Sequence, residues 1–128
     1  MTLDERGLYV KCLWREARGE GIYGMAAVAW VIWNRHIQWK VPLRRVILSP
    51  NQFTGMTDED DTPRDLQYQQ AEEIVDNILA GQSEDPTHGA LYYYNPRIAD
   101  SGWFVRNVVD DPQRHPQTAV LGNHIFYA

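Results

Sequence analysis

Residues 16–36 read EARGEGIYGMAAVAWVIWNRH, where a short charged and glycine-rich motif leads into the longest apolar run of the chain. The run from Met25 to Trp33 is apolar nearly all round a helix, which is typical of a helix buried at the centre of a domain. A strand is the alternative for so apolar a segment. Its length and its three alanines favour a helix, which we predict over residues 22–36.

Upstream of this segment, a first helix is predicted over residues 2–18. Four side chains recur at the i, i+3, i+4 and i+7 spacing of one helix face: Tyr9, Cys12, Leu13 and Glu16. The helix is expected to end at Gly19 and Gly21, because glycine adopts the left-handed conformation of a helix C-terminus without strain.

Two further helices are predicted downstream. The shorter covers residues 43–48, with Pro42 near its start and Ser49-Pro50-Asn51 as its end. The longer begins at the cap Thr62-Pro63-Arg64-Asp65 and stops at Gly81. The acidic residues 58–61 are expected to form a solvated loop.

The pattern changes after Gly81. Residues 90–94 and 124–127 are aromatic-rich and strand-like, and we expect these two segments to pair. Long, proline-punctuated loops are expected between them, with a turn at residues 121–123. Helices followed by a small sheet define an α+β fold, whose long loops are the expected place for a functional site.

Composition excludes several classes of protein. A chain of 128 residues is long enough for one domain with its own core but not for two. The net charge of −5 argues against a nucleic-acid duplex or an anionic membrane surface as partner. The single cysteine, Cys12, cannot form an internal disulfide. The longest apolar run is shorter than the roughly 18–20 residues of a membrane span, and the first residues lack a secretory-signal pattern.

Glu16 is the most informative residue because a carboxyl group occupies an otherwise apolar helix face. Burial and the negative end of the helix dipole both raise the pKa of a carboxyl group at that position. Glu20 precedes the second helix, where the positive end of the dipole favours its charged form. Two carboxyl groups pushed in opposite directions are typical of an acid/base pair, with Glu16 as the proton donor and Glu20 as a charged helper.

Simpler interpretations of both residues stay open on this pattern alone. Glu16 could be a boundary residue, or could pair with Arg15 or Arg18. Glu20 could be a residue that merely begins or caps a helix.

Motifs along nearly the whole chain resemble the spore cortex-lytic (SleB-type) cell-wall hydrolases. They are Glu16-Ala17-Arg18-Gly19-Glu20, Gly24, Ala27-Val28-Ala29, Val31-Ile32, Asn34-Arg35, Val46-Ile47, Gln52-Phe53, Asp85 to Ala90, Tyr92-Tyr93, Asn95-Pro96, Trp103 and Gly122 to Tyr127. The resemblance implies a lysozyme-like helical core and one catalytic domain over residues 1–128.

The resemblance also implies an activity. Family members with established chemistry are lytic transglycosylases, which cut peptidoglycan between N-acetylmuramic acid and N-acetylglucosamine and leave 1,6-anhydromuramic ends. The catalytic Glu of the family corresponds to Glu16. This sequence departs from the family in lacking an export signal and a separate wall-binding domain. We therefore expect a protein that is made in the cytoplasm and delivered to the cell wall by another route. We also expect it to be a monomer.

Substrate contacts are expected from the aromatic second half of the chain, because aromatic rings suit sugars that have apolar faces and polar edges. The candidates are Phe53, Tyr92, Tyr93, Asn95, Trp103 and His124, with Glu20 beside them. Within a strand, Tyr92 and Tyr94 share one face and Tyr93 takes the other. Trp30 and Trp33 are expected in the core. His124 either lines the groove or holds a loop by hydrogen bonding.

No metal or cofactor is expected. The chain has four histidines but no His-Glu-x-x-His motif, and residues 58–61 do not continue as a calcium-binding loop because Pro63 stands where glycine is required. Three alternatives stay open: a hydrolytic muramidase, a metal-dependent wall amidase using His88, His124 and an Asp, and a non-catalytic glycan-binding module.

Overall fold

The computed structural model describes residues 1–49, 52–97 and 102–128. Its elements in chain order are α1 (Glu5–Ala17), α2 (Gly21–Trp39), α3 (Leu43–Leu48), α4 (Leu66–Leu79), β1 (Tyr92–Tyr94), α5 (Gly102–Phe104), the π-helical turn η1 (Val105–Val109), β2 (Gln117–Leu121) and β3 (His124–Tyr127). The three strands form one antiparallel sheet in the order β1-β3-β2. The predicted α+β class is confirmed.

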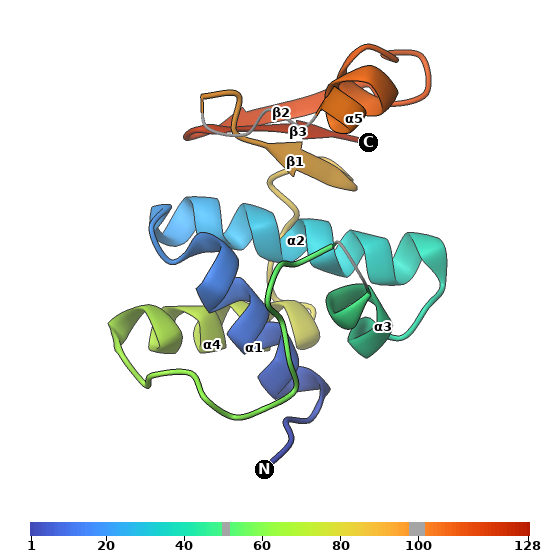
Figure 1. Cartoon of the computed structure of the whole chain (residues 1–128). Coiled ribbons are helices and arrows are strands. Elements are labelled where there is room, and N and C mark those ends of the chain that lie inside the picture. Colours follow the sequence, from blue (N-terminus) through green and yellow to red (C-terminus); the bar gives the residue numbers. More distant parts are fainter. Residues whose placement is uncertain (50–51, 98–101) are drawn as a thin grey trace.

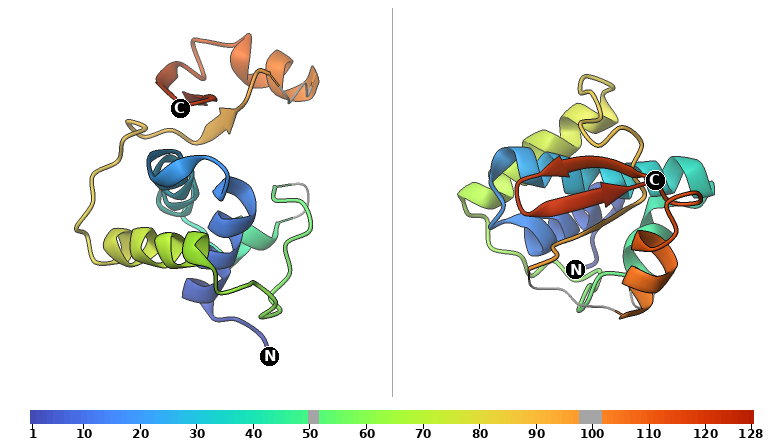
Figure 2. Two further views of the ribbon diagram at one scale, coloured as in Figure 1. Left: turned by 90° about the vertical axis from the view of Figure 1, so that its left-hand side faces the viewer. Right: turned by 90° about the horizontal axis from the view of Figure 1, so that it is seen from above.

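Helix α2 is the central element. It lies between the sheet on one side and α1, α3 and α4 on the other (Figure 1; Figure 2). Its side chains therefore enter two apolar clusters. The larger is shared with the other helices, and the smaller joins Ala27 and Val31 to Ala90 and Phe126 beneath the sheet. This double burial is the reason that the run is apolar nearly all round, as predicted.

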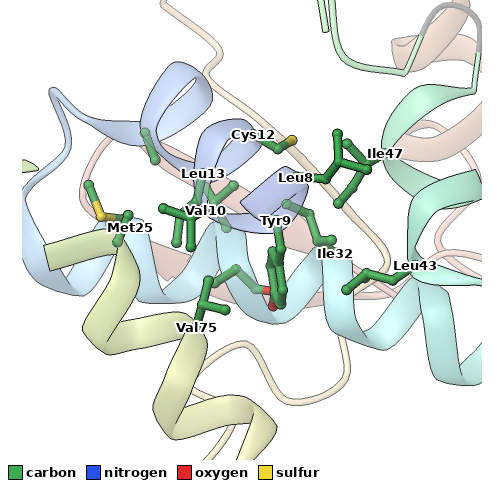
Figure 3. Packing of buried hydrophobic residues seen from close by; sticks show 14 of the residues in the cluster. Leu8, Tyr9, Val10, Cys12, Leu13, Met25, Ile32, Leu43, Ile47 and Val75 are labelled. Carbon is green, nitrogen blue, oxygen red and sulfur yellow. The ribbon is translucent and has the colours of Figure 1, made fainter. Parts of the chain in front are cut away.

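The larger cluster closes around α1 (Figure 3). Leu8, Leu13 and Met25 are completely buried there, and burying such a side chain stabilises the fold by about 1.5–3 kcal/mol. Trp30 and Trp33 pack against this cluster, as predicted. Cys12 is buried with a free thiol.

Two predicted helix starts are wrong. Helix α1 begins at Glu5 because the Asp4 side chain accepts a hydrogen bond from the Gly7 N–H, whereas Thr2 bridges to Glu59 in extended conformation. Helix α4 begins at Leu66 because Asp65, not Thr62, supplies the cap: it accepts from the backbone N–H of Tyr68 at 2.8 Å.

The other helix ends follow the predictions more closely. Helix α3 has the predicted bounds, and its C-cap is Ser49, while Pro50 and Asn51 lie outside the described residues. Helix α2 starts one residue earlier than predicted and runs three residues further, to Trp39, before Lys40 ends it in left-handed conformation.

The C-terminal half is partly as predicted. Strands β1 and β3 pair antiparallel, with Tyr93 opposite Phe126, and Gly122 makes the expected turn with a φ of +59°. The prediction of loops alone between these strands is wrong, because α5, η1 and β2 occupy much of that interval. Strand β2 pairs with β3 at the far edge of the sheet.

The acidic residues 58–61 are largely exposed but not simply solvated, which corrects the prediction. Lys11 on α1 is almost completely buried, donates to Thr57 and Glu59, and forms an ion pair with Asp61 at 2.7 Å. Asp58 and Asp60 also form ion pairs with arginines. The loop is thus fastened to the helices. In the described parts of the chain, no helix has the length and apolar character needed to cross a membrane.

Candidate active site

A cleft of about 600 Å³ lies between the helical layer and the edge strand β1. Its lining is Glu16, Glu20, Arg35, Trp39, Gln52, Phe53, Tyr92, Tyr93, Tyr94, Asn95, Trp103, Phe104 and His124. All eight site residues predicted from the sequence therefore meet at one cavity, although they come from five different segments of the chain.

Glu16 stands in the last turn of α1 with its side chain half-buried in the cleft wall. Burial raises the pKa of its carboxyl group, and the nearby charge of Arg15 opposes this only in part. No ion pair joins Glu16 to any described residue: Arg15 donates to the Thr54 carbonyl, and Arg18 lies over the Trp14 ring. The carboxyl group is thus available to hold and release a proton.

Glu20 lies at the N-cap position of α2, so it does stand at the start of the helix, but its side chain makes no capping hydrogen bond. Its Oε2 atom lies 3.7 Å from Nδ1 of His124 instead. Gly24 makes room for this arrangement, since a Cβ at that position would lie 2.7 Å from Cβ of Glu20. The lack of a side chain at Gly24, one helical turn after Glu20, therefore allows the Glu20 side chain to take this direction.

His124 begins β3 and is 7% exposed. Its Nδ1 makes no hydrogen bond with the described residues, so that atom does not hold a loop. Its ring stands edge-on to Tyr93 at 5.2 Å. Burial and the charge of Glu16 raise the pKa of Tyr93, which keeps its hydroxyl protonated. This wall thus carries the carboxyl group of Glu20 and two polar aromatic rings.

Two faces of β1 contribute differently, as predicted. Tyr93 packs against Phe126 on the α2 side of the sheet, whereas Tyr92 and Tyr94 contact Phe104 of α5. Trp103 is 61% exposed at the rim. The cleft therefore offers aromatic rings on several sides.

Asn95 and Phe53 are less free than expected for groove residues. Asn95 is 8% exposed, and its side-chain oxygen accepts from the backbone N–H of Arg97. Phe53 belongs to the large apolar cluster and is 7% exposed where it lines the cleft. Both shape the cavity as well as lining it.

Sequence reasoning missed Arg35, Trp39, Gln52 and Phe104. Arg35 is 7% exposed, donates to the Leu91 carbonyl and to Gln52, and has Trp39 at 5.4 Å from its guanidinium carbon. The available signal for Arg35 was a charged residue two positions after the apolar run, within the same predicted helix. No local pattern marks Trp39, which reaches the cleft only because α2 extends past residue 36.

Helix α2 also fixes β1 in place. Asn34 donates to the Ala90 carbonyl and to Asp85, next to the Arg35–Leu91 bond. Asp85 in turn accepts from Thr87 and from the Gly89 N–H, and despite its burial these hydrogen bonds lower its pKa. These hydrogen bonds hold the turn at residues 85–89 against α2 and thereby fix the position of β1 relative to that helix.

The described residues contain no group of three or more His, Cys, Asp and Glu side chains arranged to hold a metal ion.

Comparison with known proteins gives the family. The chain matches the sequence model of the Cell Wall Hydrolase family over residues 19–127, and it belongs to that family. It is 37% identical over 123 residues to the spore cortex-lytic enzyme of Halalkalibacterium halodurans and 34% identical over 122 residues to that of Bacillus subtilis. These matches cover 93% of this chain but only 33% and 36% of the relatives, so the chain spans about a third of their length.

Two solved structures share the fold. One is the catalytic domain of the germination-specific lytic transglycosylase SleB from Bacillus anthracis, with a TM-score of 0.70 and 30% identity over 97% of this chain and 93% of that one. The other is the catalytic domain of the Bacillus cereus SleB protein, with a TM-score of 0.68 and 31% identity over 97% and 89%. The predicted lysozyme-like architecture is confirmed by these matches.

Proposed function

We propose that residues 1–128 form a single catalytic domain that acts as a peptidoglycan lytic transglycosylase, with Glu16 as its general acid and base. The observation that carries this is the half-buried Glu16 carboxyl group in the wall of an aromatic cleft, with a raised pKa and no ion pair to any residue that the structure describes. Membership of the cell wall hydrolase family and the likeness to the SleB catalytic domains support the substrate class.

The reaction requires only one protein carboxyl group. Glu16 donates its proton to the oxygen between N-acetylmuramic acid and N-acetylglucosamine, and the bond from that oxygen to C1 of muramic acid breaks. The 2-acetamido oxygen of the substrate stabilises the positive charge at C1. The C6 hydroxyl oxygen then bonds to C1, its proton returns to Glu16, and a 1,6-anhydro ring closes without consuming water.

The remaining cleft residues bind and orient the sugars. Tyr92, Tyr93 and Trp103 supply flat apolar faces, and Tyr93 and Asn95 add polar groups. Glu20 and His124 form a polar pair in the same wall. General acid–base catalysis contributes roughly 10²–10⁴-fold, so this positioning supplies the rest of the rate enhancement.

The site of action that follows is the cell wall.

The decisive experiment is mass spectrometry of purified sacculi digested with wild-type protein and with Glu16→Gln. We expect 1,6-anhydromuramic products from the wild type and none from the variant. Reducing-end products would mean a hydrolytic muramidase instead, with Glu20 positioning water. Activity that needs a metal and survives Glu16→Gln would mean an amidase. Binding to sacculi without any released fragment would leave a glycan-binding module.

A further inference from the structure

A second cavity, of about 340 Å³, adjoins the cleft. Trp14, Arg15, Glu16, Arg18 and Thr54 line it. Glu16 lines both cavities, so they meet at the residue that the proposed reaction uses. A group attached to the sugar beside the scissile bond can therefore enter the second cavity while the sugar itself occupies the cleft.

The second cavity is positively charged. Neither Arg15 nor Arg18 lies within 4.0 Å of a carboxylate in the described parts of the chain, whereas Arg6, Arg44 and Arg64 all form ion pairs. Two acidic groups act on Arg15 without forming an ion pair with it: Glu16, which lines the same cavity, and Asp61, which pairs with Lys11. The two arginines thus place positive charge beside Glu16, in a protein whose net charge is −5.

Both guanidinium groups are held in place without being neutralised. Arg15 donates to the Thr54 carbonyl at 3.1 Å, and the approach depends on Gly55, where a Cβ would lie 2.5 Å from Nη2 of Arg15. The φ of Gly55 is +74°, which also favours glycine. The Arg18 guanidinium lies 4.1 Å from the centre of the Trp14 ring. Their remaining N–H groups are free to meet an anion.

We propose that this cavity, defined by Arg15, Arg18 and Trp14, binds the acidic peptide stem of peptidoglycan and makes stem-bearing glycan the preferred substrate. This inference rests on the proposed function. Muramic acid carries its peptide on the lactyl group at C3, and it is one of the two sugars joined by the bond that Glu16 attacks. The carboxylates of that peptide thus lie near the two arginines when the bond lies near Glu16.

Occupation of this cavity also assists the proposed acid. The charge of Arg15 is the influence that opposes the raised pKa of Glu16. A stem carboxylate beside Arg15 offsets that positive charge, and Glu16 then keeps its proton more readily. Binding of the correct substrate and readiness of the acid are therefore coupled.

The test compares two soluble substrates from the same sacculi: glycan strands with their peptide stems, and the same strands after an amidase has removed the stems and the lactyl carboxylate that this hydrolysis frees has been converted to a neutral methylamide. We expect the wild type to show a kcat/KM about tenfold higher on stem-bearing strands. Arg18→Gln lowers that ratio about threefold, and the double variant with Arg15→Gln brings it close to one. Raising the ionic strength also lowers the wild-type ratio.

The matched control is Arg45→Gln on α3, which removes the same charge from an exposed position that lies outside both cavities and has no ion pair with the described residues. It leaves the ratio unchanged. Arg18→Gln keeps the Arg15–Thr54 hydrogen bond, so it tests the charge even if loss of Arg15 disturbs the loop. Equal kcat/KM values of the wild type on the two substrates, or an equal loss on both in the arginine variants, would overturn the inference.

Failure of the proposed function gives a different result. If the wild type cleaves neither substrate, catalysis is refuted, and the binding affinities of Glu16→Gln for the two kinds of strand still decide the stem site. Tighter binding of stem-bearing strands that depends on Arg18 supports it, and equal affinity refutes it.

Discussion

Glu16→Gln is expected to abolish activity and, at neutral pH, to stabilise the protein. The substitution keeps the size of the side chain but removes the proton that both steps of the reaction use. Loss of a general acid costs roughly 10²–10⁴-fold in rate. Because Glu16 serves as donor and then as acceptor in the proposed reaction, we expect a fall in kcat of about 10³-fold or more, with little change in KM.

The stability effect follows from burial. Burial raises the pKa of Glu16 above its value of about 4.3 in an unfolded chain. The favourable contribution of the protonated side chain is complete below that unfolded value and is lost as the pH rises through the folded pKa. Glutamine is neutral throughout. The variant should therefore match the wild type near pH 3.5 and be more stable near pH 7.

The size of this gain is limited because Glu16 is only half-buried. Solvent screens such a charge, so we expect about 1 kcal/mol or less, or up to about 4 °C in melting temperature. Calorimetry at the two pH values measures it. The control is Glu73→Gln on the exposed face of α4, which should show neither effect. A variant that is less stable than wild type by the same amount at both pH values would refute the reasoning.

Three further substitutions test other parts of the site. Gly24→Ala places a methyl group against Glu20 and should raise KM about threefold to tenfold. It should not bring the helix stabilisation of about 1 kcal/mol that alanine normally gives in place of glycine. The control is Gly19→Ala, where the added methyl group meets open space, and both variants are compared by Michaelis kinetics and thermal melts. Trp103→Ala removes an exposed ring and should raise KM about twofold to tenfold with kcat nearly constant, as steady-state kinetics on soluble glycan strands would show. Asp85→Asn should lower the unfolding free energy by about 1.5–3 kcal/mol in urea titrations at neutral pH. Hydrogen bonds lower the pKa of Asp85 in the folded protein, so this loss should shrink as the pH falls from about 3.9, the pKa of an unfolded Asp, toward the folded-state pKa.

The central helix and the candidate acid could be predicted because their signals are local. Apolar residues all round α2 indicate burial on every side, and a carboxyl group on the apolar face of α1 marks Glu16. The meeting of Glu16 with residues 92–95 could not be derived from spacing. It was expected only because the order of motifs resembles a known family, and periodicity within one element says nothing about which elements adjoin.

The predictions that were wrong or missing depend on contacts between segments that are distant in the sequence. Thr2 and Asp4 are both good helix-capping residues, and the bridge from Thr2 to Glu59 decides between them. Strand β2 follows Pro116 and lies at the sheet edge, where Val120 is 59% exposed, so it lacks the apolar pattern of a buried strand. The partners of Lys11 lie more than 45 residues away in the sequence, so its burial has no local signal.

The course of α2 suggests how a glycan strand would lie in the cleft under the proposed function. The helix has 19 residues and is therefore about 28 Å long. Residues near both of its ends line the same cavity, with Glu20 at the start and Trp39 at the end. Because Glu16 precedes α2 by only a few residues, the proposed acid lies toward the Glu20 end and the aromatic rim at Trp39 lies far from it. Sugars bound at that rim do not react, so their binding energy is available to hold the reacting sugar in position. Substitutions at Trp39 should then lower kcat on long strands more than on short ones, whereas a cleft that grips only the two reacting sugars would show no dependence on strand length.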